Sequence, residues 1–233
     1  MKHLEVDGWS RRSSPLHRLD ARAKLATVLV MLAFIGSARP WTARHGIFYG
    51  GLAMAAAFAS RLSWRGLARR LTMVLPFPLV FAGMSWLASG DAADAAGLVT
   101  RSITSAAFAL ILIGVTTAPA LLDGAARLGV PAVLISVTQL LYRYLFVLFD
   151  QSVRLRNAAA CRGGFRWSAA AGAAAALFAS SEDRAERIHR AMVARGHHGA
   201  ERLLTQTHWR RADTCLLIAT LAVLLAARLL WRL

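Results

Sequence analysis

The chain has 233 residues, of which 57% are hydrophobic, and it carries 28 Lys and Arg against 12 Asp and Glu, a formal net charge of +16. Such an apolar composition excludes a soluble globular domain, and several apolar runs approach the length that crosses a bilayer. The basic residues flank these runs, which favours contact with the lipid bilayer and positive-inside topology over nucleic-acid binding. The sequence therefore predicts an all-α membrane protein.

The first part of the chain, residues 1–118, combines a polar and basic lead with four predicted transmembrane helices. These apolar segments, and a fifth near the end of the chain, cover residues 25–38, 45–60, 71–88, 99–118 and 213–231. Pro76 and Pro78 predict a kink in the third segment. Between the second and third segments we expect a basic cytoplasmic loop that contains Arg61, Arg65, Arg69 and Arg70.

The pattern changes in residues 119–212, which we interpret as a cytoplasmic region between the fourth span and the last, at 213–233. Polar residues recur here at intervals of three, four and seven, which places them on one stripe of a single helix over 132–161: Ser136, Gln139, Arg143, Asp150, Arg154, Asn157 and Cys161. At 1.5 Å per residue this helix is about 45 Å long, too long for an ordinary span. We expect it near the membrane face, although insertion of 132–149 would make a sixth span.

A second long helix is predicted from Ser168 to Arg195, with Gly196 as its stop signal. Its first half is almost entirely Ala and Gly, which allows another helix to approach closely. The end of the preceding helix offers a matching small surface. We therefore expect the two helices to cross at Ala158, Ala159, Ala160, Ala173 and Ala174.

Each of these helices ends in a similar three-residue motif, Cys161-Arg162-Gly163 or Ala194-Arg195-Gly196. Taken alone, Arg followed by Gly is an ordinary helix end, because the cation complements the helix dipole and Gly adopts the terminal conformation. Both motifs, however, end long predicted helices in one cytoplasmic segment. A guanidinium on a rigid helix end suits a carboxylate-lined groove, which favours docking of a partner protein.

A histidine-rich stretch follows the second motif and raises a metal-binding alternative. His197, His198 and Glu201 lie close together in the sequence, and His189 precedes them. They lack the spacing of histidine ligands on one helix face, so we predict no metal site. The chain also has no phosphate-binding loop, no Gly-x-Ser-x-Gly motif and no paired intramembrane carboxylates, so we expect no catalytic residue. An independent metal permease or membrane enzyme that uses the His197/His198 region remains the alternative.

The residues just described resemble the transmembrane T component of energy-coupling factor (ECF) transporters, in its CbiQ-like cobalt and nickel group. The segment from Ser14 to Leu25 looks like that group's lead into its first span, although Ala21 stands where the family often has Pro. The two Arg-Gly motifs are similar to the family's two Ala-Arg-Gly motifs, with Cys161 in place of the first Ala. The stretch 181–192 also fits the usual approach to the second motif.

The resemblance implies a non-catalytic coupling subunit in the bacterial inner membrane, without a cofactor of its own. Its partners would be two ABC-type ATPase subunits and a metal-specific, substrate-binding membrane subunit. Docking of the ATPases would fall on Arg162, Gly163, Arg195 and Gly196, with Cys161 and Ala194 beside them. Cobalt is the first expected substrate, nickel the second and a vitamin the third, and the substrate would bind to the other membrane subunit.

Overall fold

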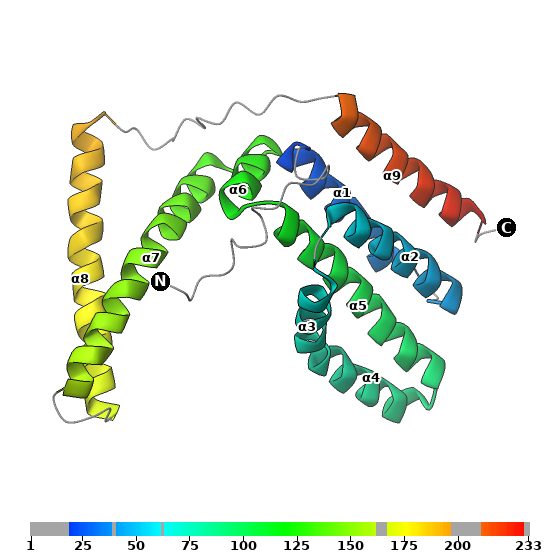
Figure 1. Cartoon of the computed structure of the whole chain (residues 1–233), viewed down its shortest axis with the longest axis horizontal. Coiled ribbons are helices and arrows are strands. Elements are labelled where there is room, and N and C mark those ends of the chain that lie inside the picture. Colours follow the sequence, from blue (N-terminus) through cyan, green and yellow to red (C-terminus); the bar gives the residue numbers. More distant parts are fainter. Residues whose placement is uncertain (1–18, 39–40, 62, 162–166, 197–210, 231–233) are drawn as a thin grey trace. The chain divides into compact units, whose positions relative to one another are not determined.

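The computed structural model describes residues 19–38, 41–61, 63–161, 167–196 and 211–230 (Figure 1). Every regular element in these ranges is an α-helix, which confirms the predicted fold class. The helices are α1 (Ala21–Ser37), α2 (Ala43–Ser60), α3 (Trp64–Val74), α4 (Pro76–Ser89), α5 (Ala92–Val115), α6 (Ala118–Arg127), α7 (Ala132–Cys161), α8 (Trp167–Ala194) and α9 (Arg211–Leu230).

The helices form two compact units. The first combines Met1–Arg127 with Gln206–Leu233, and therefore contains α1 to α6 and α9. The second, Leu128–Thr205, contains α7 and α8. The predicted division of the chain at 118/119 and 212/213 concerns location relative to the membrane, and it stays a prediction.

The first unit is built around α5, which packs against α1, α2, α3 and α4. Its main apolar core joins side chains from four helices: Met31, Ile35, Tyr49, Ala53, Ala107, Phe108 and Leu224. A smaller core lies where α2, α3 and α5 meet, around Ala57, Leu67 and Ile111. Burial of these side chains, at about 25 cal/mol per Å² of apolar surface, is the main force that holds the helices together.

Helix α9 lies parallel to α1 and is fixed to it at both ends. At the beginning, the Asp213 carboxylate is fully buried and accepts a hydrogen bond from the Asp20 backbone N–H at 2.9 Å. At the other end, the Arg228 guanidinium donates to the Ser37 hydroxyl at 3.2 Å. Leu224, with no exposed surface, fills the core between them. The last described helix is thus part of the first unit's core.

Helix α6 also packs against α1, and a glycine permits the contact. A Cβ atom on Gly124 would lie 3.2 Å from the Ala21 carbonyl carbon and 3.2 Å from the Arg22 nitrogen. Those are backbone atoms, which cannot move aside as a flexible side chain would. Gly124 is therefore required for this close approach of two helix backbones.

The predicted kink in the third apolar segment lies at Leu75, where α3 and α4 meet at an angle of 45°. Pro76 begins α4, and because proline has no N–H it leaves a carbonyl of the preceding turn without its helical partner. The prediction of a basic loop over residues 61–70 is wrong, because three of its arginines lie on helix α3. The apolar face of α3, which buries Leu67 against α5, explains why the segment is helical.

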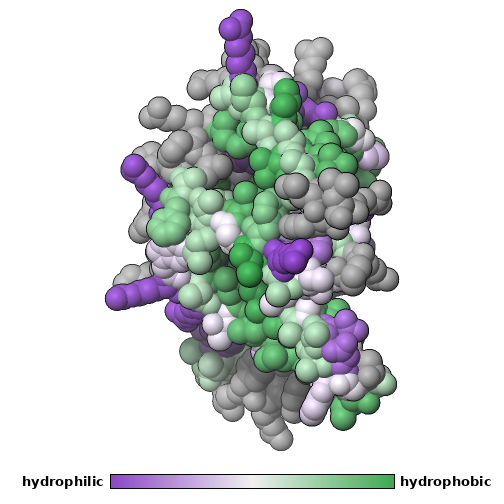
Figure 2. Space-filling model, turned by 90° about the vertical axis from the view of Figure 1, so that its right-hand side faces the viewer, coloured by the Kyte–Doolittle hydropathy of each residue, from purple (hydrophilic) through white to green (hydrophobic). Residues whose placement is uncertain are grey.

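By length and composition, three of the described helices could cross a membrane, namely α5, α7 and residues 211–229 of α9, and the bent pair α3–α4 could make a fourth. Helices α1 and α2, which the sequence predicts as spans, have 17 and 18 residues. The outer surface agrees with a lipid environment. On α4, Phe77, Met84 and Leu87 are between 63% and 81% exposed, and Figure 2 shows a face on which apolar side chains form an extended area.

Candidate functional site

The second unit is a hairpin of two long antiparallel helices, α7 and α8, with 30 and 28 residues. Their register is fixed by a polar contact in the second half of α7 and at the middle of α8. The Gln151 side-chain amide donates to the Ser180 hydroxyl at 2.6 Å, and Arg184 donates to the Gln151 carbonyl oxygen at 3.4 Å. Polar groups of this kind, half-buried between two helices, favour one register over its neighbours because a shift would leave them unpaired.

The carboxyl-terminal end of α8 has a defined geometry. Gly196 has a φ of +76°, the left-handed conformation typical of the residue after a helix end. Its N–H donates to the Val193 carbonyl at 2.9 Å, and the Arg195 N–H donates to the Ala191 carbonyl at 3.2 Å. These bonds satisfy carbonyl groups that a helix end otherwise leaves free. Arg195 is consequently held on an ordered helix end, with its side chain exposed.

A groove of about 490 Å³ lies beside this helix end, between the last turns of α8 and the first half of α7. Leu140 and Tyr144 of α7 and Ile188 and Met192 of α8 form apolar walls. Two guanidinium groups line the same groove: Arg195 from α8 and Arg143 from α7. The sequence places Arg143 on the polar stripe of α7 but does not pair it with Arg195, because only the register of the hairpin brings these two distant residues together.

The other predicted docking residues have different positions. Cys161 and Ala194, the last residues of α7 and α8, are exposed, and Cys161 is a free thiol. Arg162 and Gly163 lie outside the described residues. Because α8 begins only six residues after Cys161 and is 28 residues long, about 42 Å of helix separates its start from Arg195. The last described residues of the two helices, Cys161 of α7 and Ala194 of α8, therefore lie at opposite ends of the hairpin.

The residues of the predicted small-residue crossing lie in the part of the hairpin that follows the Gln151–Ser180 contact along α7. Counting two turns from the Gln151–Ser180 contact brings Ala158 level with Ala173. Ala159 and Ala173 are half-buried, whereas Ala158, Ala160 and Ala174 are exposed. The crossing itself stays a prediction.

The histidine alternative rests mostly on residues that the structure does not describe. His197, His198 and Glu201 lie outside the described ranges, and His189 is exposed on α8. In the part of the chain that is described, no three His, Cys, Asp or Glu side chains come together as a group that could hold a metal ion.

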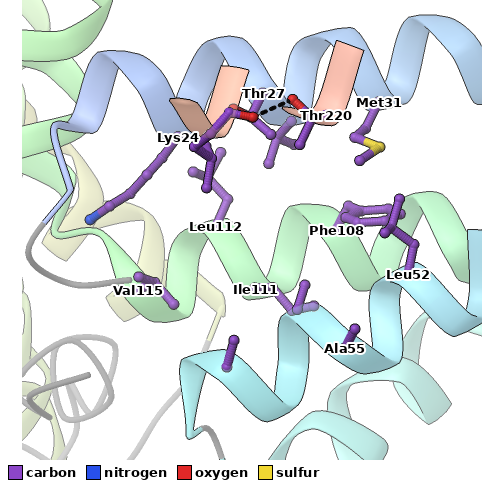
Figure 3. A pocket seen from close by; sticks show the side chains of 14 residues that line it. Lys24, Thr27, Met31, Leu52, Ala55, Phe108, Ile111, Leu112, Val115 and Thr220 are labelled. Carbon is purple, nitrogen blue, oxygen red and sulfur yellow. Dashed lines mark hydrogen bonds between the residues drawn. The ribbon is translucent and has the colours of Figure 1, made fainter. Parts of the chain in front are cut away.

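The first unit contains a cavity of about 310 Å³ between α1, α2, α5 and α9. Figure 3 shows Met31, Leu52 and Phe108 near one end of the cavity and Lys24 at the other. The polar lining consists of the Lys24 ammonium group and the hydroxyls of Thr27 and Thr220. Both hydroxyls donate to carbonyl groups of their own helices. Since its lining contributes no carboxylate, imidazole or thiolate, this cavity has no ligand set for a transition-metal cation.

Together, the long apolar helices and the exposed apolar side chains on them are those of a multi-pass membrane protein. Residues 12–209 match the family described as CbiQ, cobalt transport protein. The chain belongs to this family, and it is a membrane component of an ECF-type transporter located in the inner membrane.

Three relatives show how the similarity is distributed. The cobalt transport protein CbiQ of Rhodobacter capsulatus is 37% identical over 60% of this chain and 59% of its own length. The energy-coupling factor transporter transmembrane protein EcfT of Listeria innocua is 30% identical over 91% of this chain and 92% of its own. The uncharacterized protein MJ1571 of Methanocaldococcus jannaschii is 22% identical over 95% of this chain. The similarity thus extends over both units.

Proposed function

We propose that the chain is the coupling subunit of an ECF-type importer for a divalent metal ion, and that it transmits the motion of two ATPase subunits to a substrate-binding membrane subunit. The observation that carries this proposal is the end of α8. There Arg195 is exposed, held by the Gly196 helix stop and placed beside an apolar groove. A fixed guanidinium next to an apolar surface suits a protein partner that offers a carboxylate in a complementary groove.

The length of the hairpin supports two separate docking points. Arg195 directly follows α8 in the sequence and Arg162 directly follows α7, and α8 itself is roughly 42 Å long. One ATPase subunit can thus contact each end without competing for space. Motion of the two ATPases relative to each other would pull on opposite ends of one hairpin, and the small residues of the predicted crossing would act as its pivot.

The charge distribution on α8 supports a cytoplasmic position for the hairpin. Glu182, Asp183, Glu186, Arg187 and Arg190 are exposed along its second half. Charged groups at this density are costly in a bilayer. The same half of α8 packs beside the apolar first half of α7 at the groove. This pairing favours α7 at the membrane surface over α7 as a sixth span.

Cobalt is the substrate that the comparisons favour, because the family and the Rhodobacter capsulatus relative are both described by cobalt transport. Nickel is the second candidate, since the two ions share ligand preferences and differ modestly in affinity for a given site. The substrate ion would bind to the separate membrane subunit. ATP hydrolysis would take place in the two partner ATPases, and this chain would contribute no catalytic residue.

Charge reversal at the α8 tip tests the proposal. We expect Arg195→Glu to lower ATPase retention on the purified membrane complex by tenfold or more, because removal of one partner from a desolvated charge pair costs about 2–5 kcal/mol. Arg162→Glu should have a smaller effect, and the double variant the largest. The measurement is quantitative co-purification from membranes in mild detergent.

Arg187→Glu is the matched control, since it makes the same charge change on an exposed residue of the same helix outside the groove. It should retain the ATPases at the level of the unmodified chain. Retention of both ATPases by the Arg162→Glu/Arg195→Glu variant, at normal membrane insertion, would refute the docking roles.

A further inference from the structure

Arg143 lies in the same groove as Arg195, although 52 positions separate the two residues in the sequence. The remaining lining residues are apolar or uncharged, so the groove contains two cations and no acid. Two guanidinium groups on one small surface repel each other unless an anion lies between them. A groove of this composition is complementary to an acidic ligand.

Two other arginines of the hairpin, Arg184 and Arg190, already have side-chain partners within it. On α8, Glu186 and Arg190 form an ion pair one turn apart, and Arg184 donates to Gln151. Within the described residues, the side chains of Arg143 and Arg195 have neither a hydrogen bond nor an ion pair. Their donors are therefore available to a partner.

The position of Arg143 is supported by its neighbour. Its guanidinium carbon lies 5.9 Å from the centre of the Tyr144 ring, within the range of a cation–π contact. Tyr144 itself is half-buried and lines the groove. Such a contact limits the conformations of a long side chain, so that less entropy is lost when the guanidinium binds an anion.

We propose that Arg143 is a second docking cation, and that Arg143 and Arg195 together hold an acidic segment of the ATPase subunit that binds the α8 end. This inference rests on the proposed coupling function and adds a residue of α7 to its docking surface. A protein carboxylate is favoured over a lipid phosphate because Leu140, Ile188 and Met192 provide apolar walls around the cations, as at a protein interface with a desolvated centre.

The experiment compares ATPase affinity for the full chain and its variants, purified with the substrate-binding subunit and reconstituted in nanodiscs. We expect Arg143→Glu to weaken ATPase binding by about tenfold or more, and Arg143→Lys, which keeps the charge but loses the planar fork, to weaken it less. Arg143→Gln should also make binding less sensitive to salt, since one ionic contact is lost. Because both arginines contact one acidic segment, the losses from Arg143→Gln and Arg195→Gln should not be additive.

Arg154→Glu is the control for Arg143→Glu. Arg154 is exposed on the same helix, eleven residues or about three turns further on, and therefore on nearly the same face but outside the groove. The Arg154→Glu variant should bind the ATPase normally. Normal recovery of the substrate-binding subunit with each variant verifies that the chain is folded.

The possible results separate this inference from the function on which it rests. If Arg195→Glu releases the ATPase but Arg143→Glu does not, the role of Arg143 is refuted and the coupling function stands. If neither releases it, the coupling role of this helix end fails as well. Two further results also overturn the inference: an equal loss with Arg154→Glu, or an Arg143→Glu variant that keeps the ATPase and loses only bound anionic lipid.

Discussion

At the scale of single residues, the α8 end joins two properties that a docking point requires, a fixed backbone and an available charge. Gly196 supplies the first through its positive φ, and Arg195 supplies the second. Both residues could be predicted from the sequence, because helix stop signals depend on a few neighbouring positions. Arg143 could not be paired with Arg195 in this way, since their proximity depends on how α7 and α8 align.

Replacement of Gly196 tests whether backbone geometry matters at this end. Open space surrounds the glycine, so Gly196→Ala adds no clash but forces a left-handed conformation on a residue with a side chain. That conformation costs about 1–2 kcal/mol. We expect the last turn of α8 to open more often, with amide hydrogen exchange in residues 191–196 accelerated by about fivefold or more.

Gly172→Ala is the corresponding control in the same helix. Gly172 also has open space around it, but it lies inside α8 without a positive φ, where alanine is the better helix former by about 0.5–1 kcal/mol. Exchange in residues 191–196 should not change in this variant. Unchanged exchange in Gly196→Ala as well would show that the glycine stop does not hold Arg195 in place.

At the scale of helices, long periodic segments were predictable and short ones were not. The stripe of polar residues predicts the bounds of α7 at 132 and 161, and α8 differs from its predicted range by one residue at each end. Part of α3 was predicted as a loop because its arginines interrupt the apolar pattern of the face that packs on α5. Helix α6 was missed because it is ten residues long and contains Pro119 and Gly124, which are usually turn signals.

The contact between α6 and α1 gives a prediction for packing between helices. Gly124→Val places a branched side chain against the backbone of Ala21 and Arg22. Overpacking of this kind costs about 1–3 kcal/mol, so we expect the melting temperature of the detergent-solubilised protein to fall by several degrees. Gly83→Val, on α4 where nothing lies within 4 Å, makes the same change in helix propensity without the clash. If the two variants melt alike, Gly124 is not needed for the approach of α6.

At the scale of the whole molecule, composition was sufficient to predict a multi-pass all-helical membrane protein, because apolar content and helix length reflect the bilayer directly. The pairing of α9 with α1 could not be predicted from the sequence. It depends on Asp213 and Asp20, two acidic residues 193 positions apart whose contact has no local pattern. The proposed role of a coupling subunit likewise depends on the resemblance, since no periodicity reveals which proteins a helix end contacts.

Purification of the intact assembly tests the role of the whole chain. From native membranes in mild detergent, we expect an ABC-type ATPase and a small metal-handling membrane protein to remain bound, as identified by mass spectrometry. The chain alone in liposomes should not take up Co²⁺. If the isolated chain transports Co²⁺, and His197→Ala and His198→Ala abolish that uptake, the protein is an independent permease and not a coupling subunit.

The attachment of α9 to α1 has a consequence for how the protein is made. Synthesis at about 5–20 residues per second separates Asp20 from Asp213 by roughly 10–40 s. During that time the core residues of α1, α2 and α5 are synthesised without Leu224, their partner from α9. The first unit is therefore completed last, after the hairpin has been translated. Chains interrupted before α9 would therefore lack both the Asp213 acceptor and the Leu224 side chain that complete the core of this unit.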